Sequence, residues 1–227
     1  MSDFNIGPAV RAARAAASEH RLTLGVGHAQ EILASQFGFN TYNGMIVELA
    51  QTREGTGLLS AEHYILNSDW GLQRCRALRL PRELAACCLV GAQEAFGNLF
   101  TNVDDFWHAV ARDEVIRQVN DDEHFSAAMA ALAHVEYDPE GFELDRQSKN
   151  FWQARTRWVL HTSGEMQGAF SDEDGEDFLE EETIDVWGRV TYQKAGRAGL
   201  VLSNVEVSPV PDRFSNPCAG SFAHANH

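Results

Sequence analysis

The sequence of 227 residues lacks a long apolar run and has few cysteines. Its longest apolar stretch is too short and too often interrupted to span a bilayer. The N-terminus has no basic stretch followed by an apolar core, so we expect no signal peptide. No two cysteines form a C-x-x-C pair, which favours reduced, buried thiols and a cytoplasmic location. The four cysteines are Cys75, Cys87, Cys88 and Cys218.

Basic residues are scarce as well. The chain has 18 Lys and Arg against 33 Asp and Glu, which gives a formal net charge of −15. Only Lys149 and Lys194 are lysines. A chain this acidic repels phosphate backbones on average, so it is a poor general binder of nucleic acid. We therefore expect a protein partner rather than nucleic acid or a membrane.

Motifs that carry catalysis are missing. The sequence has no H-E-x-x-H zinc motif, no G-x-S-x-G nucleophile motif and no glycine-rich phosphate loop after a strand. The histidines are scattered over separate predicted helices, so they do not form a ligand set. We expect no catalytic residues, no metal and no cofactor. An enzyme of unknown class stays open as an alternative, because a site can assemble without a motif.

The chain does have enough apolar residues, 44%, to bury a core. The alanine-rich stretch Ala9–Arg21 predicts a helix. A second predicted helix is capped by Ser60 and runs to about Arg79, and a third runs from Arg82, after Pro81, to about Phe100. Two capping boxes predict two further helices. They are Thr101 with Asp104, and Asn120 with Glu123.

The pattern changes after Val135. Arg157–Thr162 is typical of a strand, and apolar residues alternate with polar ones over Ile184–Tyr192, which is the period of a half-buried strand. A glycine-containing connection, Gln193–Gly199, leads to a second β-like run, Leu200–Ser208. The two runs predict an antiparallel hairpin.

These observations predict an α+β fold with an N-terminal helical domain and a small antiparallel β-rich region. The predicted domains are residues 1–135, helical; residues 136–212, β-rich; and residues 213–227, a flexible tail. An alternative is a single α+β domain whose sheet packs on the helices.

The segment Leu24–Leu49 predicts two helices joined by a tight turn. Ala34 in the first helix and Gly38 in the turn fit the helix-turn-helix of DNA-binding proteins. The second helix fits poorly, because no Arg or Lys follows until Arg53. A DNA-associated regulator that uses residues 24–49 is therefore the alternative to a plain packing unit.

The same segment, HAQEILASQFGFNTYNGM, resembles a short helical module. That module stands at the start of some bacterial proteins labelled glyoxalase-superfamily and occurs in assorted proteins of mobile elements. The resemblance implies a helical module around His28–Tyr42 and not the glyoxalase activity, whose metal-binding domain has no counterpart in the chain. The matching residues are His28, Gln30, Leu33, Ala34, Gly38, Phe39, Thr41 and Tyr42.

Two charge clusters are candidate partner-binding surfaces. The first is basic and falls where a helix C-terminus is expected, so its cations also suit the helix dipole. The second lies within Ser171–Glu182, a run of eight acids that we predict to be a solvated loop. The candidates are Arg74, Arg76, Arg79 and Arg82 in the first cluster, and Asp172, Asp174, Asp177 and Glu181 in the second.

Together these features predict a bacterial, cytoplasmic, non-catalytic protein with an acidic surface. We expect it to act through protein–protein contacts, as an adaptor, inhibitor or regulator. The sequence leaves its biological process and its oligomeric state open.

Overall fold

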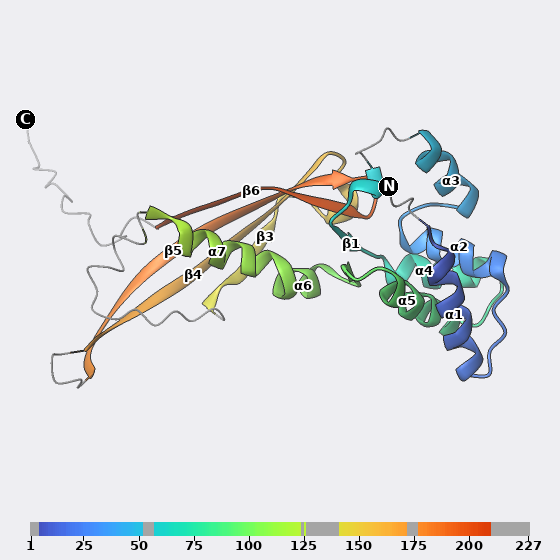
Figure 1. Cartoon of the computed structure of the whole chain (residues 1–227), viewed down its shortest axis with the longest axis horizontal. Coiled ribbons are helices and arrows are strands. Elements are labelled where there is room, and N and C mark those ends of the chain that lie inside the picture. Colours follow the sequence, from blue (N-terminus) through green and yellow to red (C-terminus); the bar gives the residue numbers. More distant parts are fainter. Residues whose placement is uncertain (1–4, 52–56, 124, 126–140, 172–176, 210–227) are drawn as a thin grey trace, which may run out of the picture.

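A computed structural model describes residues 5–51, 57–123, 125, 141–171 and 177–209 of the chain. It is an α+β fold, as predicted: most helices are N-terminal, and a mixed six-stranded sheet extends from them (Figure 1). The strands are β1 (His63–Ile65), β2 (Leu99–Phe100), β3 (Glu143–Gln147), β4 (Arg157–Ser171), β5 (Asp177–Ala195) and β6 (Gly199–Pro209). Their order in the sheet is β2-β1-β6-β5-β4-β3. None of the described helices has the length and apolar character that crossing a membrane requires.

Five helices pack together as one helical unit. Its alanine-rich first helix lies directly against its last helix. A Cβ atom at Gly91 would lie 2.4 Å from the backbone nitrogen of Ala13 and 2.5 Å from the carbonyl oxygen of Ala9, so only glycine allows this approach. The helices are α1 (Gly7–Glu19), α2 (Val26–Gln36), α3 (Tyr42–Gln51), α4 (Ser68–Ala77) and α5 (Glu83–Ala95).

Three of these helices, α1, α2 and α4, end in the same way. Each is followed by a residue with positive φ: Arg21 at 58°, Gly38 at 91° and Arg79 at 57°. In each case the next residue donates its backbone N–H to a carbonyl five positions back, for example Phe39 to Ala34 at 2.9 Å. This is the Schellman arrangement, which satisfies the last carbonyls of the helix. Glycine, which suits positive φ best, occupies only one of the three positions.

A second core lies between the sheet and the chain segment that follows β2. This segment contains α6 (Val103–Phe106), the π-helical turn η2 (Trp107–Ala111) and α7 (Arg112–Asp121). Phe106 contacts the ring of Tyr192 at 5.1 Å between centroids, and both side chains are fully buried. Val115 of α7 faces Gly188 of β5. The helices α6 and α7 therefore cover one face of the sheet (Figure 1).

The predicted antiparallel hairpin is confirmed, because β5 pairs with β6 from Ala195 and Gly199 outward. The strand predicted at Arg157–Thr162 is also confirmed and continues as β4 to Ser171.

The predicted helix from Ser60 to Arg79 is wrong in its first half. Ser60 ends a short 3₁₀ turn, η1 (Gly57–Ser60), and β1 follows it. The helix that does form, α4, is capped by Asn67, which accepts the backbone N–H of Trp70 at 3.0 Å. The predicted helix to Phe100 is likewise too long, since α5 ends at Ala95 and β2 follows. Both strands are short and exist because β1 pairs with β2 and with β6.

Both predicted capping boxes need correction. The cap of α6 is Asn102, one residue later than predicted, and it accepts the backbone N–H of Asp105 at 2.7 Å. Thr101 donates instead to the Asp105 carboxylate at 2.9 Å. Asn120 lies inside α7 and is not the cap of the next helix. Asp122 takes that role, because it accepts the backbone N–H of Phe125 at 3.3 Å and residues 123 and 125 are helical. The rest of the helix predicted after it falls within residues 126–140, outside the described residues.

The buried residues form two cores, and their border bears on the predicted domains. The first core belongs to the helical unit, with Ala198 of the β5–β6 turn among its members. The second joins the sheet to residues 103–121. The division at residue 135 stays a prediction, as does the flexible tail, which lies outside the described residues.

Candidate binding groove between the helical unit and the sheet

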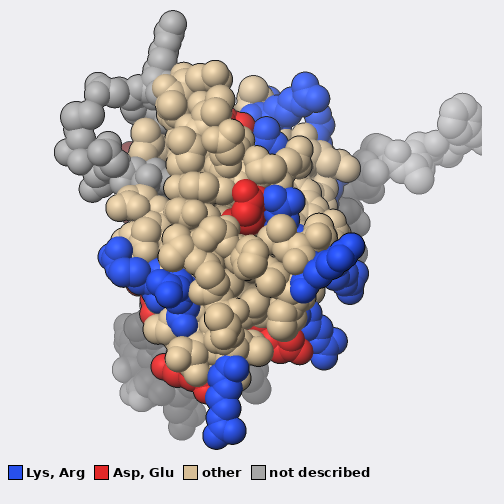
Figure 2. Space-filling model, turned by 90° about the vertical axis from the view of Figure 1, so that its right-hand side faces the viewer, with Lys and Arg blue, Asp and Glu red and all other residues tan. Residues whose placement is uncertain are grey.

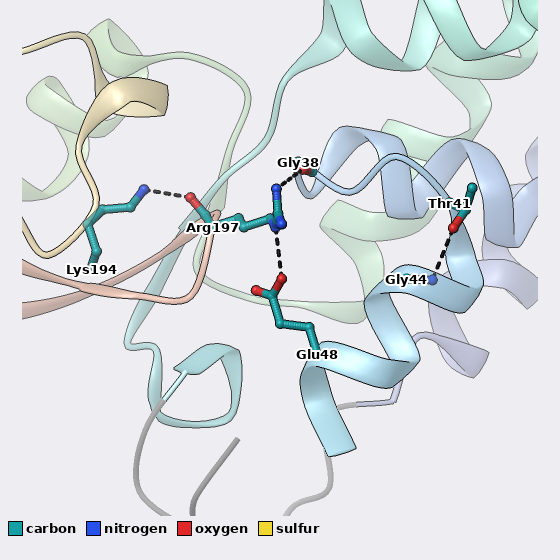
Figure 3. A network of polar contacts seen from close by, with 6 residues as sticks. All are labelled: Gly38, Thr41, Gly44, Glu48, Lys194 and Arg197. Atoms are coloured by element: carbon teal, nitrogen blue, oxygen red, sulfur yellow. Dashed lines mark hydrogen bonds and ion pairs between the residues drawn. The ribbon is translucent and has the colours of Figure 1, made fainter. Parts of the chain in front are cut away.

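The turn between β5 and β6 reaches the turn between α2 and α3. Arg197 donates from Nε to Glu48 Oε2 at 3.0 Å and from Nη1 to the carbonyl oxygen of Gly38 at 3.2 Å (Figure 3). Its guanidinium carbon also lies 5.1 Å from the centroid of the Phe39 ring. One arginine thus holds the segment that the family resemblance singled out.

That segment forms the two helices and the turn predicted for it. Leu33 and Ala34 are fully buried, and Thr41 begins α3 by accepting the backbone N–H of Gly44 at 3.0 Å (Figure 3). Two features of the turn require glycine at position 38. Its φ is +91°, and an added Cβ atom would lie 3.2 Å from both Arg197 Cβ and a ring carbon of Trp152.

Two tryptophans meet beside this turn. Trp70 of α4 and Trp152 of the 3₁₀ turn η4 (Phe151–Gln153) lie 4.8 Å apart between ring centroids, at an interplanar angle of 53°. They line a hollow of about 500 Å³. A second hollow, of about 470 Å³, shares Gly38, Trp70 and Arg197 with the first and continues along α4 to Arg74. We call these two adjoining hollows the seam groove.

Lys194 lies under the same turn. Its ammonium donates to the carbonyl oxygen of Arg197 at 2.6 Å (Figure 3). The ammonium also lies 3.2 Å from the centroid of the Phe151 ring. Burial removes water from the amine and lowers the pKa of Lys194 to about 7. The ring face and the carbonyl favour the charged form of the amine, whereas burial favours its neutral form.

A third hollow, of about 610 Å³, adjoins the seam groove through Arg155 and opens on the outer face of the sheet. Arg157 and Arg189 line it as well. Arg189 forms an ion pair with Glu206 at 2.6 Å. We call this hollow the arginine pocket.

Of the predicted basic cluster, only Arg74 reaches the seam groove, where it forms an ion pair with Glu31 of α2. Arg76 lies in the last turn of α4 and Arg79 just beyond it, both exposed. Arg82 precedes α5 and pairs with Glu83 at 3.3 Å. The prediction that the cluster surrounds a helix C-terminus is confirmed. The docking role of these arginines stays a prediction.

The prediction that the acidic run forms one solvated loop is wrong for its second part. Asp172 and Asp174 lie outside the described residues, but Asp177 and Glu181 belong to β5, and Asp177 is paired with Ser171 of β4. This strand begins at the end of the molecule far from α4 (Figure 1). The described part of the acidic run therefore does not meet the basic cluster within one chain.

The acidity is unevenly distributed. Residues 1–101 hold nine acidic and eight basic residues, and residues 102–227 hold 24 acidic and ten basic ones. The end of the molecule formed by the helical unit accordingly shows more Lys and Arg than Asp and Glu (Figure 2). The strong negative charge belongs to the second part of the chain.

The described residues contain no group of three or more His, Cys, Asp or Glu side chains that could hold a metal ion. Cys75, Cys87 and Cys88 are buried free thiols, and burial raises the pKa of each. Raised pKa values make thiols poor nucleophiles. Burial lowers the pKa of His63, which contacts the rings of Phe100 and Phe106.

Sequence reasoning singled out Gly38 and Arg74 but missed other residues that make the groove. Arg197 and Lys194 fell in a stretch predicted to be a mere connection, and Trp70 was assigned to a longer helix. Their common property is proximity in space, for which the sequence carries no local signal. Comparison with family models, curated proteins and solved structures found no match, so the functional argument depends on the geometry.

Proposed function

We propose that this chain is a non-catalytic protein that binds a protein partner at the seam groove, as an adaptor, inhibitor or regulator. The observation that carries the proposal is the pairing of Trp70 with Trp152 beside Arg197 in an open hollow. Tryptophan and arginine are the residue types that most often dominate the energy of protein interfaces. Their rings offer a large apolar area, while the guanidinium orients polar groups of a partner.

The surface of α3 supports a protein partner. Ile46 and Val47 are exposed, at 42% and 48% of their surface, and α3 contains no Lys or Arg. Exposed neighbouring aliphatic side chains suit contact with another protein. A helix that reads the major groove instead presents polar and basic side chains to base edges and phosphates.

One observation favours the alternative, a DNA-associated regulator. The two helices do form around Gly38 as in a helix-turn-helix, and the helical unit does not share the strong negative charge of the rest of the chain. The two functions differ in what binds α3. Duplex DNA would need the arginines of other elements, whereas a protein would cover Ile46 and Val47.

The proposal is tested by capture from the native host with tagged wild type, Trp70→Ala and Trp152→Ala. Trp187→Ala is the matched control, because Trp187 contacts His161 and lines neither hollow of the seam groove. We expect a protein that stays bound after nuclease treatment and is lost from the first two variants alone. Melting temperatures of all variants verify folding. Capture that depends on nucleic acid, or that is equal in all three variants, contradicts the proposal.

A further inference from the structure

The arginine pocket lies on the sheet face opposite to α7. Val115 of α7 faces Gly188, so the next residue, Arg189, projects from the other side of β5. Directly opposite cross-strand partners share a face, and Arg157 is paired with Gln193, while Arg189 is paired with Glu206. Three adjacent strands thus place two arginines, an amide and a carboxylate on one face of the sheet.

Among the described residues, the positive charge of this pocket is only partly compensated. Glu206, paired with Arg189, is the one acidic residue among the described residues that line it. Arg155 and Arg157 are exposed and form no ion pair with any described residue. Arg189 Nε is buried and has no hydrogen-bond partner among the described residues. Lys194 also lines the pocket, but its ammonium is bound to the Arg197 carbonyl.

The remaining lining is rich in neutral hydrogen-bond donors. Hydroxyl and amide groups can satisfy oxygen atoms that the guanidinium groups leave free. The combination of arginine forks with hydroxyl and amide groups suits oxyanions such as carboxylates and phosphates. These neutral residues are Thr156, Thr191, Gln193, Ser203 and Asn204.

We propose that the arginine pocket binds the carboxylates of an acidic segment of the partner protein. The inference rests on the proposed function and extends it, because Arg155 lines both the pocket and the seam groove. A partner chain that covers Trp70 and Trp152 can continue into the pocket. Its acidic side chains then replace the missing counter-charges of Arg155 and Arg157.

Charge favours a short acidic segment over a single strand of nucleic acid. The chain has a net charge of −15, and residues 102–227 carry 24 acidic against ten basic residues, so the chain as a whole repels an extended polyanion. At physiological salt, screening limits the range of this repulsion to about 8 Å. A short acidic segment held at the pocket therefore meets less of the repulsion than a long nucleic acid strand does. Glu48 and Glu206 also interrupt the arginines along the hollows, so a phosphate chain finds no continuous row of cations.

The test measures binding of fluorescent hexaglutamate to the full chain by anisotropy, with hexaglutamine as the uncharged probe. The variant Arg155→Gln/Arg157→Gln removes the two uncompensated charges. The variant Arg11→Gln/Arg21→Gln is matched in charge and removes two exposed arginines that line none of the three hollows. We expect the first to weaken hexaglutamate binding roughly tenfold or more and the second to change it less than about twofold.

The inference is overturned if wild type does not bind hexaglutamate, or if both variants lose affinity equally. It is also overturned if a labelled oligothymidylate binds more tightly than hexaglutamate with the same dependence on Arg155 and Arg157. If the glutamine variant does not fold, Arg155→Lys/Arg157→Lys replaces it. That variant keeps the positive charges but loses the bidentate guanidinium groups, so we expect a smaller loss of hexaglutamate affinity than in the glutamine variant. An unchanged affinity would contradict bidentate pairing of the arginines with carboxylates. Partner capture that depends on Trp152 but not on these arginines would leave the proposed function standing and remove this inference alone.

Discussion

Arg197 in the β5–β6 turn forms an ion pair with Glu48 of α3, a residue 149 positions earlier in the chain. The same guanidinium donates to the Gly38 carbonyl. One side chain therefore connects the hairpin to the α2–α3 turn at Gly38 and to the second half of α3 at Glu48, and it lines both hollows of the seam groove.

The first prediction concerns Arg197. Arg197→Ala removes a half-exposed ion pair and a bond to a carbonyl, so we expect a loss of about 1 kcal/mol in the free energy of unfolding. Urea denaturation measures it, and amide exchange is expected to rise in α3. Arg82→Ala removes a more exposed ion pair to Glu83 and is the control, with little expected change. An equal loss of stability in the two variants would show that the contacts of Arg197 with Glu48 and Gly38 do not stabilise the fold.

The second prediction concerns Gly38. Gly38→Ala forces an L side chain into positive φ and against Arg197 and Trp152, and we expect a loss of about 2 kcal/mol. Gly27 lies in α2, where an added Cβ atom meets nothing within 4 Å. Gly27→Ala is therefore expected to stabilise the chain by up to about 1 kcal/mol. Thermal and urea denaturation of both variants decide between these opposite signs.

The third prediction concerns Arg79, which has positive φ after α4. Arg79→Gly keeps the Schellman hydrogen bonds and relieves the backbone, so we expect a gain of about 0.5–1 kcal/mol. Arg76→Gly, inside α4, removes the same side chain from a helical position and should cost about 1 kcal/mol. A loss of stability in both variants would show that the Arg79 side chain matters more than its backbone.

These positions also show what could be predicted from the sequence. The hairpin was recognisable because Ile184–Tyr192 alternates with period two, and α1 because its alanines favour helix. The strands β1 and β2 were not recognisable, because segments of three and two residues become strands only through pairing with partners far away in the chain. The groove escaped prediction for the same reason. Arg197 meets Gly38 and Glu48 only after the sheet has docked on the helical unit.

The fourth prediction concerns Lys194, whose pKa burial lowers to about 7 from the ordinary value of 10.5. Below pH 7 both states carry the ammonium, and the folded state bears the desolvation that lowers its pKa. Between about pH 7 and 10.5 the folded state loses the proton while the unfolded state keeps it, so stability rises with pH. NMR of methylated lysines resolves Lys194 from Lys149, the only other lysine. A Lys194 midpoint near 10.5, or an unchanged stability profile in Lys194→Met, would contradict this assignment.

The fifth prediction concerns duplex DNA. The net charge of −15 and an α3 without Lys or Arg predict weak binding to generic duplex at physiological salt. Anisotropy titration with a random duplex measures it. Submicromolar affinity that falls steeply with salt would promote the DNA-associated regulator over the protein-contact function.

The central claim is that a protein partner occupies the seam groove, and the most direct measurement is nuclease-treated capture from the native host with wild type and Trp152→Ala. We predict that wild type retains a stoichiometric protein and that Trp152→Ala, folded by its melting temperature, loses it. Retention of that protein by folded Trp152→Ala, or recovery of nucleic acid in its place, would contradict the account.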